Sequence, residues 1–208
     1  EVMSGGGRTG AFLAGEHWGL QPDLIALSKG FAAGYAPLGA MVARGDMVEA
    51  VLDAGGFIHG FTYAGNPLSC SAGLAVLKEL EDKQLIKQAA IKGNELKKRL
   101  TQLKHKFPFI GDVRGKGLLL AFELMADVQS KEPLPSDLNA HSRLVEIAYK
   151  NGLIIYSRRT RGGLEGDHFM VCPPLTISDD EMTHLLQMLD KSLQELATEL
   201  ALSTGSEE

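Results

Sequence analysis

The sequence predicts a mixed α/β chain, and three patterns support this fold class. Short apolar runs at residues 24–27 and 39–43, with glycine close by, suit short buried strands better than helices. Apolar residues then recur at helical spacing from residue 68 to about residue 104. Beyond residue 105, strand-like and helix-like segments alternate. The second half therefore predicts a compact α+β unit, joined to the first part by long helices.

Composition excludes several classes of protein. The chain has 208 residues, of which 44% are hydrophobic and 23% charged, and this mixture excludes disorder as the main state. There is no run of about 20 apolar residues, so no membrane span is expected. A formal net charge of −5 gives no field that would attract nucleic acid or anionic lipid. Cys70 and Cys172 form neither a disulfide framework nor a metal cluster, which favours a reducing cytoplasm.

The first half is glycine-rich and then helical. More than half of the 24 glycines lie in the first 73 residues. A short helix is expected from residue 45 to the glycines at 55–56. Asn66 and Pro67 are typical of a helix cap and first turn. A second amphipathic stretch covers residues 84–104, and its basic face, formed by Lys92, Lys97, Lys98 and Arg99, is interpreted as a solvated surface rather than a site for an anionic partner.

The second half has its own succession of elements. A strand is expected at 117–124, an exposed loop at 126–138, a helix at 139–151, a strand at 152–156, an Arg/Gly loop at 157–167 and a strand at 168–172. Ser178 with Glu181 three residues later predicts a capping box that opens the last helix.

Lys29 is the first candidate for chemistry. It lies between the apolar run 24–27 and the small residues that follow it. Small neighbours would let another group approach the amine, and a desolvated lysine is a competent nucleophile towards carbonyl carbons. The alternative is an ordinary lysine at a strand end that reaches solvent.

Three other segments leave two interpretations open. The glycines of 4–10 could form a nest of N–H groups for phosphate or a plain turn, and the segment lacks the ending of a P-loop. The segment 59–67 combines a glycine, a threonine hydroxyl and a helix start, which could contact phosphate. Arg158, Arg159 and Arg161 could bind a substrate carboxylate or form a solvated basic loop.

These motifs, in this order, resemble the class III pyridoxal-phosphate aminotransferases, also called omega-aminotransferases. The resemblance covers nearly the whole chain. It is carried by Glu-Val-Met and Gly-Arg-Thr-Gly at 1–10, Leu-Ser-Lys-Gly at 27–30, His-Gly-Phe-Thr-Tyr at 59–63 with Gly-Asn-Pro-Leu at 65–68, and the stretch 167–175 with its two prolines.

The resemblance implies an α/β protein of fold-type I. Residues 1–72 would be the C-terminal part of the large cofactor domain, 73–104 connecting helices, and 105–208 the small α+β domain. The cofactor would be pyridoxal 5'-phosphate, with Lys29 forming the Schiff base and moving a proton between substrate and cofactor. Val2 matches the residue that packs against the ring. Phe61 and Thr62 match the contact with the cofactor phosphate of the neighbouring subunit.

The same resemblance implies transfer of an amino group from an amine or omega-amino acid to a keto acid such as pyruvate, in a homodimer with shared active sites. From composition and residue spacing, a cytoplasmic protein without metal, nucleic acid or membrane partners is expected. Tyr156 stands where many members place the arginine for the substrate carboxylate. Arg158, Arg159 or Arg161 could take that role.

Two departures qualify this expectation. The family aspartate that pairs with the pyridine nitrogen precedes Glu-Val, and the sequence begins at Glu1. The family's N-terminal half is also absent, so the chain is expected to be a fragment. Three further interpretations stay open: a racemase or decarboxylase of the same fold, an inactive dimerising fragment, and a glycine-loop nucleotide-binding module.

Overall fold

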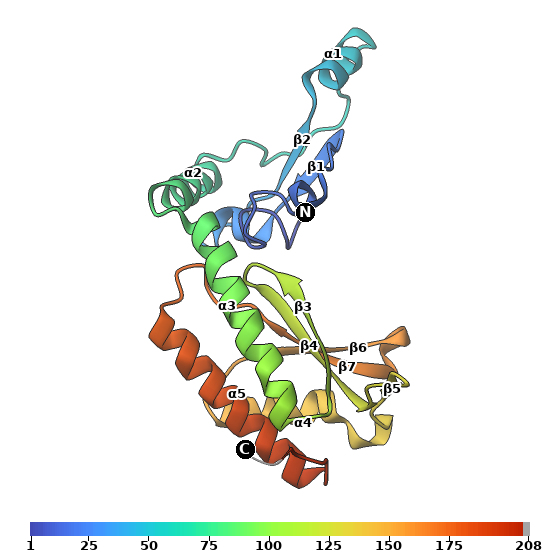
Figure 1. The fold of residues 1–208 in the computed structure, drawn as a ribbon. Coiled ribbons are helices and arrows are strands. Elements are labelled where there is room, and N and C mark those ends of the chain that lie inside the picture. The colour runs from blue at the N-terminus through green and yellow to red at the C-terminus, as the bar shows by residue number, and fades with distance from the viewer. Residues whose placement is uncertain (206–208) are drawn as a thin grey trace. The chain divides into compact units, whose positions relative to one another are not determined.

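The computed structural model describes residues 1–205, apart from the side chain of Arg161. The chain divides into a first unit, Glu1–Ala90, and a second unit, Ile91–Glu208. The α-helices are α1 (Gly45–Asp53), α2 (Pro67–Asp82), α3 (Leu85–Lys106), α4 (Ala140–Lys150) and α5 (Asp179–Glu199) (Figure 1). The strands are β1 (Leu24–Leu27), β2 (Ala40–Ala43), β3 (Ile110–Lys116), β4 (Leu119–Asp127), β5 (Glu132–Pro133), β6 (Tyr156–Thr160) and β7 (Glu165–Val171).

The first unit contains a small sheet in which β1 and β2 pair antiparallel. Both strands lie where the apolar runs predict them. The expectation that they are buried is wrong for this chain, because Leu24 is 54% and Met41 64% exposed while only Leu27 of β1 is buried. The physical reason is that, within the described residues, these two strands have only each other as neighbours in the sheet.

Helix α2 begins as predicted. The Asn66 side-chain Oδ1 accepts hydrogen bonds from the backbone N–H groups of Leu68 and Ser69, both at 3.1 Å, and Pro67 occupies the first turn. Gln84, with a φ of +51°, separates α2 from α3. The two amphipathic stretches are therefore two helices, as the spacing predicts.

The second unit is an antiparallel sheet packed on helices. Its strand order is β3-β4-β7-β6, and β5 pairs with the end of β4. Alternate residues of β4 are buried, and Phe122 stacks on Phe169 of β7 with ring centroids 4.9 Å apart. Helices α4 and α5 and the end of α3 lie on one side of this sheet (Figure 1). The unit therefore has its own core, and the predicted α+β arrangement is confirmed.

Several elements of this unit differ from the expectation. The strand predicted at 117–124 is β4 at 119–127, the loop predicted at 126–138 contains β5, and β3 was not predicted. Residues 152–155 are not a strand. Gly152 and Leu153 instead close the end of α4: Gly152 has a φ of +86°, its N–H donates to Tyr149 O, and the N–H of Leu153 donates to Ala148 O. This is a Schellman-type ending, which occupies backbone groups that a strand would need. The predicted Arg/Gly loop at 157–167 is correspondingly wrong at both ends, since β6 covers residues 156–160 and β7 begins at residue 165.

The final helix follows its prediction. Ser178 Oγ accepts from the Glu181 N–H at 3.2 Å, and a Glu181 carboxylate oxygen accepts from the Ser178 N–H at 2.7 Å. This capping box opens α5, whose leucines at 186, 189, 193 and 196 are buried. No helix in residues 1–205 is long and apolar enough to cross a membrane.

Candidate active site

Strand β1 ends at Leu27, and after Ser28 the chain enters a 3-10 turn, Lys29–Ala32, that begins with Lys29. Its φ is +49°, in the left-handed region that residues with a side chain rarely adopt. Ser28 supports the turn, because its hydroxyl donates to the carbonyl of Leu38 at 3.1 Å. Strain of this kind concentrates at functional sites, so the backbone supports the assignment of chemistry to this lysine.

The surroundings of Lys29 are open. The side chain is exposed, and within the described residues its ammonium makes no hydrogen bond or ion pair. A Cβ added at Gly30 or Gly34 would meet no atom within 4 Å. This arrangement fits the attachment of a carbonyl-bearing cofactor, since the amine is accessible and its neighbours are small.

The glycine-rich segment 4–10 is a turn. The N–H groups of Gly6 and Gly7 donate to the carbonyl of Phe12 at 2.8 and 3.3 Å, and the N–H of Gly10 donates to Gly7 O. Because these donors are used within the segment, they do not form a nest for phosphate. Of the two interpretations that the sequence left open, the turn is confirmed.

Glu1 organises this turn, and the sequence did not single it out as a functional residue. Its carboxylate accepts hydrogen bonds from the N–H of Ala14 at 2.7 Å, the N–H of Gly15 at 2.8 Å and the hydroxyl of Ser4 at 2.9 Å. Burial acts to raise the pKa of the Glu1 carboxyl, but these donors, together with the positive charge on the Glu1 nitrogen, outweigh burial, and the pKa lies below its ordinary value.

The segment proposed for phosphate lies between α1 and α2. Phe61 is 70% exposed and borders a cavity of about 840 Å³ whose lining includes Phe31, Leu38 and Leu74 but neither Lys29 nor Thr62. Thr62 is exposed in the turn that leads to α2. Of the four residues Val2, Lys29, Phe61 and Thr62, only Phe61 lines this cavity.

The three arginines of the second unit have different environments. The Arg158 guanidinium lies over the ring of Tyr156, 4.6 Å from its centroid. Arg159 is engaged elsewhere: its Nε donates to a carboxylate oxygen of Asp167 at 2.8 Å, and its guanidinium donates to the Ser136 carbonyl. The Arg161 side chain lies outside the described residues. Arg158 is thus the arginine whose described contacts leave its donors available for a carboxylate.

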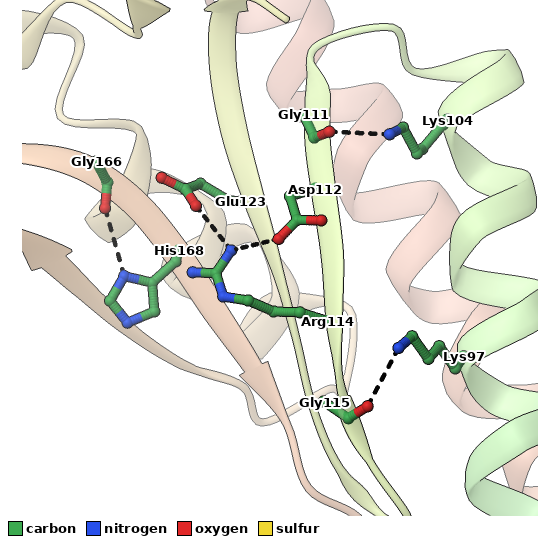
Figure 2. Close-up of polar contacts among 9 residues, drawn as sticks. All are labelled: Lys97, Lys104, Gly111, Asp112, Arg114, Gly115, Glu123, Gly166 and His168. Carbon is green, nitrogen blue, oxygen red and sulfur yellow. Dashed lines mark hydrogen bonds and ion pairs between the residues drawn. The ribbon is translucent and has the colours of Figure 1, made fainter. Parts of the chain in front are cut away.

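The basic face of α3 is partly structural, which the sequence did not reveal. Lys97 and Lys104 donate to the carbonyls of Gly115 and Gly111 in β3, at 3.2 and 2.8 Å (Figure 2). Arg99 donates to the hydroxyl of Thr183, and Lys92 to the carbonyl of Ile177. Lys92, Lys97 and Arg99 of the predicted basic face are half-buried and fasten α3 to neighbouring elements, so the solvated-surface interpretation is wrong for these three, while Lys98 is exposed as predicted.

A polar cluster lies on the same sheet. Figure 2 shows Arg114 between two carboxylates, Asp112 at 2.9 Å and Glu123 at 2.7 Å. Burial acts to lower the pKa of Arg114, but the bonds to Asp112 and Glu123 outweigh it and raise that pKa. His168 bonds to the Gly166 carbonyl beside them. The cluster joins neighbouring strands and contains no set of residues suited to hold a metal among those described.

Comparisons with known proteins agree on one family. Residues 1–193 match the model of the class-III aminotransferases. The chain is 42% identical over 197 residues to the uncharacterized aminotransferase YodT of Bacillus subtilis, covering 93% of this chain and 44% of YodT. It is 36% identical over 196 residues to a leucine/methionine racemase of Thermococcus litoralis, covering 94% of this chain and 41% of the racemase.

A solved structure gives the same result. An amine transaminase from an uncultivated Pseudomonas species, in its PLP-bound form, superposes with a TM-score of 0.85 at 34% identity, over 94% of this chain and 44% of that one. The fold is accordingly that of the pyridoxal-phosphate-dependent transferases of fold-type I. Within that class, the chain belongs to the class III aminotransferases, whose cofactor is pyridoxal phosphate. It spans less than half the length of these relatives.

Proposed function

We propose that this chain is the C-terminal part of an aminotransferase that moves an amino group from an amine or omega-amino acid to a keto acid such as pyruvate. The observation that carries the proposal is the turn at Lys29, which follows β1: the backbone of Lys29 has a left-handed φ, and its amine is accessible. The match to the family model over residues 1–193 supports it. We place the parent in the cytoplasm as a homodimer.

The residues of the chain would divide the work as follows. Lys29 would hold pyridoxal phosphate through Nζ and, once displaced by the amine substrate, would move a proton at that atom. The cofactor supplies an electron sink for the substrate carbon when it is bound. Val2 would pack against the ring and orient it. Phe61 and Thr62 would contact the phosphate of the cofactor in the neighbouring subunit, Thr62 through its hydroxyl.

The substrate would be recognised in the second unit. Arg158 would bind the carboxylate of an acidic substrate, with Tyr156 beneath its guanidinium as a support. Arg161 is a further candidate. In domain terms, residues 1–72 would belong to the large cofactor domain, 73–104 to connecting helices and 105–208 to the small domain. The 41–44% coverage of the relatives supports the interpretation of the chain as a part of a longer protein.

Borohydride reduction of the full-length parent tests the proposal. The expected result is a cofactor fixed to the peptide that contains Lys29, with loss of the absorbance band of the lysine-bound cofactor. Lys29→Ala should abolish labelling, and Lys78→Ala, which removes an exposed lysine of α2, should leave it unchanged. Labelling at a different lysine would refute the assignment.

Racemisation is the second candidate, and the 36% identity to a leucine/methionine racemase favours it over decarboxylation. Transfer and racemisation use the same lysine but give different products. Formation of alanine from pyruvate and an amine donor would support transfer. Loss of optical activity from a single amino acid without any keto acid would support racemisation instead.

A further inference from the structure

The Glu1 carboxylate is the centre of a small hydrogen-bonded frame. One oxygen accepts from the Gly15 N–H, and the other accepts from the Ala14 N–H and the Ser4 hydroxyl. Both oxygens are therefore needed, and each faces only donors. The frame is defined here as Glu1 together with residues 4–15, which this carboxylate connects across 13 and 14 positions of the chain.

The frame lies against the lysine turn. A Cβ on Gly5 would stand 2.5 Å from Leu27 Cδ2, and one on Gly6 would stand 3.9 Å from the backbone of Gly30. The Glu1 nitrogen also donates to the carbonyl of Ala26 in β1 at 2.7 Å. Ala26 and Leu27, before Lys29 in the sequence, and Gly30, after it, thus lie against the frame.

We infer that Glu1 is a positioning residue, whose ionised carboxylate holds the frame rigid and so keeps Lys29 in its left-handed turn. This inference rests on the proposed role of Lys29 as the residue that holds the cofactor. Glu1 acts through the backbone and touches no reacting atom. The lowered pKa of Glu1 agrees with a carboxylate that stays charged in the folded state.

The chemistry of the frame makes glutamine a poor replacement. A carboxamide keeps one acceptor oxygen, but its NH₂ group would face a backbone N–H or a hydroxyl donor where an acceptor is required. Bonds to charged groups contribute more than neutral ones, so Glu1→Gln should weaken binding of pyridoxal phosphate to the full-length parent by about tenfold or more.

The experiment compares Glu1→Gln with Asp23→Asn in the full-length parent. Asp23 is a matched control, because it lies directly before β1 and its ion pair with Arg44 is exposed. Two quantities are measured: the dissociation constant of pyridoxal phosphate, and hydrogen exchange of the cofactor-free protein. Glu1→Gln should accelerate exchange at Ala14 and Gly15 and in residues 28–31, while Asp23→Asn should change neither quantity by more than about twofold.

The outcomes separate this inference from the proposed function. A wild-type parent that carries no cofactor on Lys29 refutes the proposed function. Unchanged exchange and unchanged cofactor affinity in Glu1→Gln overturn the inference while leaving the proposed function intact. If Glu1→Gln does not fold, Ser4→Ala tests the inference in its place. This substitution removes the hydroxyl that donates to the Glu1 carboxylate, and it should weaken cofactor binding about threefold. Wild-type affinity and exchange in Ser4→Ala would then overturn the inference.

Discussion

Replacing Asp167 with alanine should destabilise the second unit more than any surface substitution, and the structure gives the magnitude. Asp167 is 2% and Arg159 13% exposed, and their 2.8 Å bond is a buried ion pair. Removing one partner of such a pair costs about 3–5 kcal/mol, because the other charge remains buried. Arg159 keeps its bond to the Ser136 carbonyl, so we expect the lower end, about 3 kcal/mol.

Two measurements test this loss of stability. Urea unfolding gives the free energy of unfolding, and hydrogen exchange of the β6 and β7 amides reports the stability of these two strands. In a double-mutant cycle with Arg159→Met, the coupling between the two positions should be about 1.5–3 kcal/mol. The exposed pair Lys191–Glu195 is the control, and Glu195→Gln should cost less than about 0.5 kcal/mol. A loss below about 1 kcal/mol for Asp167→Ala, or additive single effects, would refute the view that this pair is a buried unit.

Three further outcomes are expected. Asn66→Ala should cost about 1 kcal/mol and speed exchange at the start of α2, because the cap is lost; equal exchange rates would contradict this. Gly93→Ala should cost about 1–3 kcal/mol in thermal unfolding, since its Cβ would overlap the backbone of Gly117, and a neutral result would show that α3 can shift. The stabilisation that ionised Glu1 gives to the folded state should be complete above the ordinary pKa of 4.5 and should be lost as pH falls through the lower folded-state pKa. The free energy of unfolding is measured against pH for wild type and Glu1→Gln, and parallel curves would exclude this stabilisation.

Helix ends were predictable because they depend on neighbours in the sequence. Asn66 caps residues two and three positions away, and Ser178 and Glu181 bond to each other across three positions. The strand predicted at 152–156 was wrong because the pattern of apolar residues there resembles that of a strand. Leu153 and Ile155 are buried while Ile154 is exposed, which gives a strand-like alternation. However, Gly152 ends α4 with bonds that apolar periodicity does not report.

The residues of the candidate site differ in the same respect. Lys29 was predicted from its motif, and its positive φ is compatible with that prediction, which stays untested. Glu1 could not be assigned a partner from sequence, because its acceptor role depends on backbone N–H groups of Ala14 and Gly15, whose residue types carry no signal for it. The same holds for Arg159 and Asp167, which β-pairing places opposite each other. The roles of all the predicted site residues stay predictions: Val2, Lys29, Phe61, Thr62, Tyr156, Arg158 and Arg161.

The first unit exposes many large apolar side chains. Ile58 is 98% and Tyr35 86% exposed, and Phe61 borders an open cavity. Single exposed apolar residues are ordinary, but so many in one unit are typical of a surface that another part of a protein covers. The second unit, by contrast, buries its four phenylalanines and most of its leucines, although Leu164 is 70% exposed. Apolar runs at β1 and β2 are typical of strands buried on both faces, and their exposure follows if the pattern reflects the longer parent rather than this chain. The chain spans 41–44% of these relatives, and the proposal that it is part of a longer protein would account for the exposure of β1 and β2.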